Sequence, residues 1–124
     1  MFRPTVGNDT YFYPGDPRYP HDPALGEGLW TYSRATLTKV YLDAGATVTY
    51  VVEDDDGVNL AGETWPQTAT FVSGSLGKFV VLLRDTIAFQ PHVECNLVIT
   101  IDYGADALGR LVERLHPILP GQGP

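Results

Sequence analysis

Histidine and acidic residues occur together at two places in the chain, where they offer ligand types that zinc uses. His21 precedes Asp22, and His92 lies two residues before Glu94. A zinc site needs three or four ligands that converge with a defined spacing. Each pair supplies only two, and His116 stands apart from both. The spacing therefore favours ordinary surface histidines, and we expect neither a metal ion nor another cofactor.

A run of four acidic residues, Glu53–Asp56, precedes Gly57. A calcium loop alternates its acidic ligands and is closed by a glutamate further along the chain. The run lacks this alternation, and Glu63 lies at the wrong distance to close such a loop. The Asp-Gly pair instead predicts a tight hairpin turn with a solvated tip, because these residues tolerate positive φ angles.

Nucleophilic catalysis would need an activated cysteine or serine, and neither has a suitable context. Cys95 is the single cysteine, and the alternation around it places it inside a strand rather than in an exposed electropositive site. Ser33, Ser73 and Ser75 lie outside any Gly-x-Ser-x-Gly pattern. The glycine-rich segment 74–78 is expected to join two strands, so no helix N-terminus follows it to bind phosphate. We expect no catalytic residues, and therefore no enzyme.

The composition limits the possible partners. The formal net charge is −7, and eight Lys and Arg residues are scattered over 124 positions. A nucleic-acid-binding surface needs clustered basic residues, so we expect no such binding. No segment approaches the roughly 20 apolar residues of a transmembrane helix, so we expect no membrane contact. Hydrophobic residues make up 44% of the chain, which is typical of a globular protein.

Short segments of alternating apolar and polar residues, separated by Gly and Asp turn signals, extend from residue 31 to residue 119. This pattern predicts an all-β fold, an antiparallel β-sandwich of about seven strands. The expected strands cover residues 31–43, 46–53, 58–60, 67–73, 78–84, 93–103 and a final segment. That final segment, 108–118, is ambiguous, because its Leu and Val spacing fits a helix as well as a last strand.

The same alternation predicts which side chains face the core. The expected inward residues are Val48, Tyr50, Val52, Ala69, Phe71, Phe79, Val81, Leu83, Val93, Cys95, Leu97, Ile99 and Ile101. Ile87 and Phe89 are expected to plug the core from the connection between two strands. The inward position of Cys95 predicts a small buried hydrophobic residue rather than a reactive thiol.

Residues 1–30 have a different character, with five prolines between Pro4 and Pro23 and no hydrophobic period. Proline fixes φ and removes a hydrogen-bond donor, which excludes helix and disfavours a central strand. We therefore predict an extended arm over residues 1–30, a sandwich over 31–119 and a flexible tail over 120–124. Because the sandwich holds nearly all the alternating apolar positions, we expect it to fold without the arm.

Five aromatic residues of the arm are candidates for binding a partner. They are Tyr11, Phe12, Tyr13, Tyr19 and Trp30. Tyrosine and tryptophan supply interface energy with few rotatable bonds to immobilise. The alternative is that the arm folds back onto its own sandwich and covers an edge strand. Each arrangement could hold for a different half of the arm.

Several motifs between residues 35 and 115 occur in one order. They are the strand Gly45–Tyr50 with the turn Asp54–Gly57, the strand Gly77–Leu83, the strand Leu97–Asp102 and the closing Gly109–Leu111. In these motifs the chain resembles the small immunoglobulin-like domains of tailed-phage structural proteins. It departs from them at residues 91–95, where that group more often has Pro-Gly-x-Tyr. The resemblance implies an immunoglobulin-like sandwich whose last strand follows Gly109.

The resemblance also implies a virion component, such as a capsid decoration, neck or tail-associated subunit. Its partners would be other virion proteins, including capsid, portal or tail subunits, present in many copies in a symmetric assembly that forms in the host cytoplasm. One alternative is a free immunoglobulin-like module that binds a protein or glycan through hairpin tips such as Asp54–Gly57. A small enzyme is a minor alternative.

Overall fold

The computed structural model describes residues 1–102 and 108–121, which contain nine β-strands and no helix. The strands are β1 (Thr10–Phe12), β2 (Trp30–Ser33), β3 (Thr38–Tyr41), β4 (Thr47–Glu53), β5 (Gln67–Thr68), β6 (Thr70–Phe71), β7 (Phe79–Leu83), β8 (Cys95–Asp102) and β9 (Leu108–Leu115). The predicted all-β class is confirmed. Two expected strands are each divided in two, and β1 lies in the segment that was expected to be an arm. The strand expected at residues 58–60 is absent from the described part of the chain, where Asn59 forms only an isolated bridge to Glu53.

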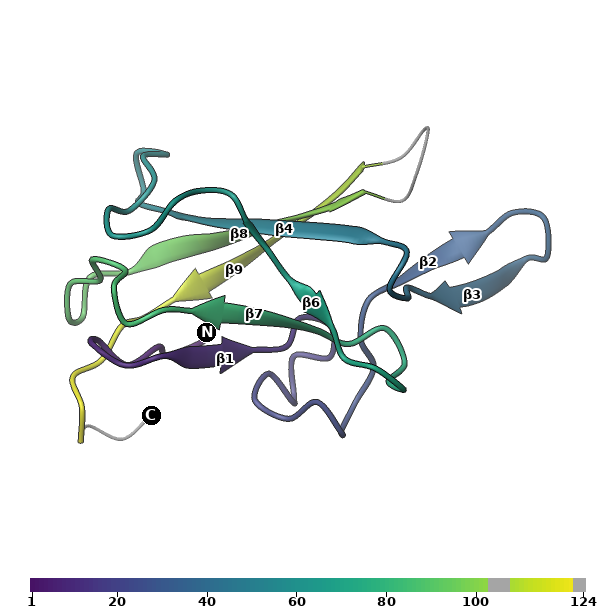
Figure 1. The fold of residues 1–124 in the computed structure, drawn as a ribbon, viewed down its shortest axis with the longest axis horizontal. Helices are drawn as coiled ribbons and strands as arrows, with labels where there is room; N and C mark the ends of the chain where they lie inside the picture. Colours follow the sequence, from purple (N-terminus) through teal and green to yellow (C-terminus); the bar gives the residue numbers. More distant parts are fainter. Residues whose placement is uncertain (103–107, 122–124) are drawn as a thin grey trace.

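Two antiparallel sheets form the body of the molecule (Figure 1). One has the strand order β5-β4-β8-β9, and the other has the order β1-β7-β6. Buried side chains from both sheets join in one hydrophobic cluster. The body is therefore an antiparallel β-sandwich, while β2 and β3 pair only with each other and project from one end of it.

Alternation along the central strands places the core where the sequence predicts it. Strand β4 buries Val48, Tyr50 and Val52. Strands β7 and β8 bury Phe79, Val81, Leu83, Cys95, Leu97, Ile99 and Ile101. The predicted plugs Ile87 and Phe89 are also buried.

One predicted core residue is placed differently by the structure. Val93 is 54% exposed, because β8 begins only at Cys95 and Val93 lies in the turn before it. The prediction that Val93 faces the core is therefore wrong.

The chain crosses from one sheet to the other at Ala69. Strand β5 pairs with β4, whereas β6 pairs with β7. The predicted single strand over residues 67–73 therefore serves both sheets. Ala69 is buried as expected, and Phe71 packs against the core with its ring edge-on to Phe79 at 5.4 Å.

The N-terminal segment is part of the sandwich. Phe2 is 2% exposed and Phe12 is 5% exposed, and their rings meet edge to face with centroids 4.8 Å apart. Strand β1 pairs with β7 along its whole length, while Phe2 and Thr5 form parallel bridges to Leu115 and Ile118. The sequence-based division at residue 30 does not match this packing, because contacts distant in sequence hold residues 2–12 against the sandwich, with Phe2 and Phe12 in the core.

Residues 13–28 form an ordered connection rather than a free extended arm. The backbone N–H of Asp16 donates to the carbonyl of Glu27 at 2.8 Å, which closes the connection on itself. Lys78 is only 2% exposed, and its Nζ donates to the carbonyl of Leu25 at 2.6 Å. A charged group is rarely buried unless it is hydrogen-bonded, so this contact fastens the connection to the body.

The hairpin of β2 and β3 replaces the single strand predicted for residues 31–43. Residues 34–37 turn the chain, and Leu37 adopts a φ of 56°. Positive φ is uncommon for leucine, and hairpin turns are usually marked by pairs such as Asn-Gly. No such pair occurs between β2 and β3, so the turn had no sequence signal.

The C-terminal segment forms a strand, which decides the ambiguity at residues 108–118. Strand β9 pairs antiparallel with β8 from Leu108 to Leu115. The sequence also predicts a turn before this strand, at residues 104–109, most of which lies outside the described residues. The predicted tail at 120–124 is described only as far as residue 121.

Candidate functional site

The projecting hairpin presents one aromatic face. Trp30 lies opposite Tyr41, and Tyr32 lies opposite Lys39, in the antiparallel pairing of β2 and β3. Directly opposite residues and residues two apart share a face of a two-stranded ribbon, so these four side chains lie on one side. We call them the hairpin face. Trp30 is 44% exposed and Tyr32 is 54% exposed, so the face offers large aromatic surfaces to a partner.

Polar contacts order the hairpin face. Lys39 Nζ lies 4.7 Å from the centre of the Trp30 ring and 5.6 Å from that of Tyr41, which is cation–π geometry. Glu27 accepts hydrogen bonds from Lys39 Nζ at 2.8 Å and from the Tyr41 hydroxyl at 2.9 Å. Both hydrogen bonds lower the pKa of Glu27, and the one from Lys39 has the larger effect. The Trp30 and Tyr41 rings are thus positioned in the free protein, which reduces the entropy lost on binding.

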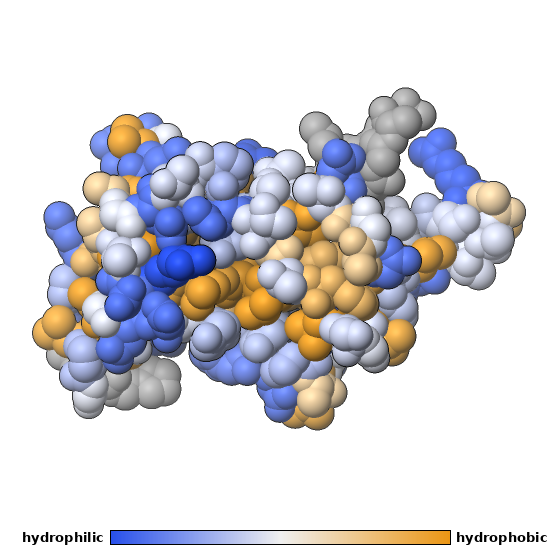
Figure 2. All heavy atoms as spheres, in the orientation of Figure 1, coloured by the Kyte–Doolittle hydropathy of each residue, from blue (hydrophilic) through white to orange (hydrophobic). Residues whose placement is uncertain are grey.

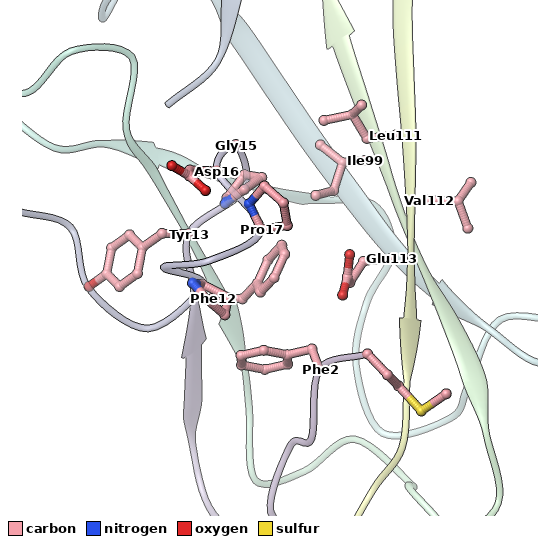
Figure 3. A pocket seen from close by; sticks show the side chains of 13 residues that line it. Phe2, Phe12, Tyr13, Gly15, Asp16, Pro17, Ile99, Leu111, Val112 and Glu113 are labelled. Carbon is pink, nitrogen blue, oxygen red and sulfur yellow. The ribbon is translucent and has the colours of Figure 1, made fainter. Parts of the chain in front are cut away.

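A groove and a cavity continue from the hairpin face along one side of the sandwich. The groove has a volume of about 440 Å³, and its lining includes Trp30 and Glu27. The cavity has a volume of about 290 Å³ and lies between the proline-rich connection and β9 (Figure 3). Asp16, Pro17 and Leu111 line both. We call the hairpin face, groove and cavity together the docking surface.

Three carboxyl groups lie on the docking surface, and two of them are paired with cations. Glu113 points from β9 into the cavity (Figure 3), and burial raises its pKa. Arg18 donates to both oxygens of Asp16, at 3.1 and 2.8 Å, and its side-chain hydrogen bond is the main reason that the pKa of Asp16 falls to about 2. Glu27 in the groove is the third. The ion pairs of Asp16 with Arg18 and of Glu27 with Lys39 balance two of these charges, so the surface suits a partner mainly through its apolar and aromatic area.

The five aromatic residues expected to bind a partner do not share one surface. Phe12 is 5% exposed, so the expectation that it anchors a partner is corrected: the pairing of β1 with β7 turns its side chain into the core. Tyr11 is 53% exposed on the other face of β1. Tyr13 is half-buried and lines the cavity, while Tyr19 is half-buried in the connection. Trp30 lies on the hairpin face.

Tyr32, Lys39, Tyr41 and Glu113 were missed by the sequence-based account. The alternation of Trp30 and Tyr32 was a usable signal, because residues two apart share a face of a strand. Treating residues 31–43 as one strand hid their neighbours across the turn. The place of Glu113 depends on β9 being a strand, which the sequence left open.

A separate apolar area lies on the outer side of the three-stranded sheet. Figure 2 shows apolar residues gathered over β6 and β7 in the middle of this view. The outward side chains of Val80 and Leu82 are half-buried there, and Tyr11 lies opposite Leu82.

The acidic tip at residues 54–57 forms the tight turn that the Asp-Gly pair predicts. Gly57 has a φ of 80°, and Asp54 Oδ1 accepts the backbone N–H groups of Asp56 and Val58. Asp55 forms an ion pair with Arg114 of β9. The tip is therefore bound to its own sandwich, which weakens its candidacy as a partner-binding tip.

Cys95 should be inert towards thiol reagents in the folded protein. It is 3% exposed, as the alternation predicts, and burial raises the pKa of its thiol to about 11. Because the thiolate is the reacting species, we expect negligible reaction with DTNB near neutral pH and complete reaction in urea. Fast reaction of the native protein, followed by absorbance, would contradict the placement of Cys95 in the core.

Within residues 1–102 and 108–121, no helix has the length and apolar character to cross a membrane. Comparison of the chain with models of protein families, with curated proteins and with solved structures gave no match.

Proposed function

We propose that this protein is a structural subunit of a tailed-phage particle, in the capsid decoration, the neck or the tail, and that it attaches to neighbouring proteins through the docking surface. The observation that carries the docking role is the hairpin face. Trp30 and Tyr32 are exposed there, while Lys39 and Glu27 order their surroundings. Ordered, exposed aromatic residues are typical of the energetic centres of protein interfaces. The virion setting is supported by the sequence resemblance.

We propose further that the sandwich is immunoglobulin-like. Such domains place strands B, E and D side by side in one sheet and strands C, F and G in the other. The orders β1-β7-β6 and β4-β8-β9 are compatible with this arrangement. On this correspondence the hairpin lies in the connection between strands B and C, which is a binding loop in variable domains. The position of the hairpin therefore supports a role in docking.

The proposed partners are other virion proteins, such as capsid, portal or tail subunits, repeated in a symmetric assembly that forms in the host cytoplasm. The net charge of −7 favours a partner with basic residues. The same charge disfavours nucleic acid.

The test follows the untagged protein during particle production by the phage genome that encodes it. Particles are purified on a gradient, treated with nuclease, washed in salt and measured by quantitative mass spectrometry. We expect a constant number of copies per particle that survives both treatments. Recovery of the protein only in the unassembled fraction would overturn the structural role.

A free module that binds a protein or a glycan is the second candidate. The hairpin face favours it as well, because exposed Trp and Tyr side chains combine apolar area with a polar group. The same fractionation separates the two functions, since a free module would remain outside the particles.

A further inference from the structure

Two histidines meet at the end of the four-stranded sheet that lies away from the hairpin (Figure 1). His92 lies shortly before β8, and His116 directly follows β9. The pairing of Cys95 with Leu115 brings these two ends of the strands together. His92 Nδ1 and His116 Nε2 are 3.2 Å apart in a hydrogen bond whose donor depends on the tautomer, although the residues are 24 positions apart in the chain.

We propose that His92 and His116 bind one divalent transition-metal ion, with zinc as the first candidate, through these two facing nitrogens. Two nitrogen ligands at about 2.0–2.1 Å from a tetrahedral zinc ion lie about 3.3 Å from each other. The observed separation of 3.2 Å matches this spacing, and the ion takes the place of the proton in the hydrogen bond between the two nitrogens. The ring planes are inclined by 58°, with centroids 5.4 Å apart, so the rings approach at an angle and are not stacked.

Glu94 is the positioning residue of this site. Its Oε2 lies 3.4 Å from His116 Nδ1, the nitrogen on the other side of the ring from His92. Metal-binding histidines usually donate their second N–H to a carboxylate, which leaves the lone pair of the first nitrogen for the metal. Glu94 is itself held by Arg114, whose Nε donates to Oε1 at 3.1 Å. The carboxylate thus selects the tautomer of His116 that binding requires.

The backbone also holds the two rings together. His92 adopts a φ of 61°, and its N–H donates to the carbonyl of Pro117 at 2.8 Å. Left-handed backbone at a residue other than glycine persists where the surroundings fix it, and such positions are concentrated at functional sites. Because Pro117 directly follows His116, this bond ties together the segments that carry both ligands.

The donor set determines the class of ion. Imidazole nitrogen suits zinc, copper and nickel, whereas magnesium and calcium require oxygen ligands. No group of three or more His, Cys, Asp or Glu side chains that could hold a metal occurs in the described part of the chain. The protein therefore supplies only the two histidines, and water or a ligand from a neighbouring molecule must complete the coordination that zinc requires. This proposal replaces the expectation of unconnected surface histidines.

The experiment is calorimetric titration of the untagged full-length protein with zinc chloride near neutral pH, in a buffer that does not bind zinc. We expect a saturable site that weakens on acidification, because protons compete for the ligand nitrogens. His92→Asn should abolish it, and asparagine also tolerates the left-handed backbone. Glu94→Gln should weaken binding by about 10–100-fold, the usual effect of removing a carboxylate that orients a ligand. His21→Ala is the control, because His21 packs against the ring of Phe2 and is not one of the two proposed ligands.

Saturable zinc binding that disappears in His92→Asn and persists in His21→Ala supports the site. Absence of saturable binding up to millimolar zinc would overturn it. Binding that His92→Asn leaves unchanged, or that His21→Ala removes equally, would also overturn it. Circular dichroism melts of each variant ensure that loss of binding is scored only on folded protein.

Discussion

A chain that begins at residue 13 should fail to fold cooperatively. The truncation removes Phe2 and Phe12 from the core, together with the pairing of β1 with β7 and the parallel bridges to the end of β9. Loss of one buried phenylalanine side chain typically costs about 3–5 kcal/mol, and whole domains are stable by only about 5–15 kcal/mol. The measurement is a circular dichroism melt, and a sharp transition like that of the full chain would contradict the placement of residues 2–12.

Two neighbouring substitutions refine this test in the intact chain. Phe12→Ala should lose about 3–5 kcal/mol of unfolding free energy through lost burial and a cavity. Tyr11→Ala, on the exposed side of the same strand, should lower the unfolding free energy by no more than about 1 kcal/mol. Equal losses in urea titrations would mean that β1 does not face the core as described.

Ile99→Ala should have the second large effect on stability. Ile99 is 1% exposed at the middle of β8, between the neighbouring strands β4 and β9. Removing its side chain should cost about 2–5 kcal/mol. The next residue, Thr100, is exposed, and Thr100→Ala should lower the unfolding free energy by no more than about 1 kcal/mol. Similar midpoints for the two variants in urea would show that the register of β8 is wrong.

The sequence predicted the central strands well because their signals are local. Alternation around Tyr50 and around Ile99 follows directly from the period of two along a strand. The turn at Gly57 was predictable from its Asp-Gly pair. The segment from residue 108 onwards was ambiguous in the sequence. It is a strand because it pairs with β8, and its local spacing does not reveal that pairing.

The N-terminal segment was not predictable for a physical reason. Three residues, Thr10–Phe12, are too few to show a period, and the prolines beside them masked the strand. What holds Phe2 in place is a bridge to Leu115, at the far end of the chain. Composition and spacing carry no information about such a contact.

The candidate sites depend on the same kind of distant pairing. Trp30 was recognisable as an exposed aromatic, but its neighbours Tyr41 and Lys39 join it only through an unmarked turn. His92 and His116 come together only through the pairing of β8 with β9. In both cases the residue types were visible in the sequence and the juxtaposition was not.

The docking role of the hairpin face is tested most directly by incorporation of a Trp30→Ala/Tyr32→Ala double variant into particles. Both side chains are exposed, so the variant should keep the melting behaviour of the unmodified protein. Tyr11→Ala, which removes an exposed aromatic outside the docking surface, is the matched control. The measurement is the number of copies per purified particle, by quantitative mass spectrometry. We predict that the double variant is absent from particles while the control is present at the normal level; a folded double variant that incorporates normally would contradict docking through the hairpin face.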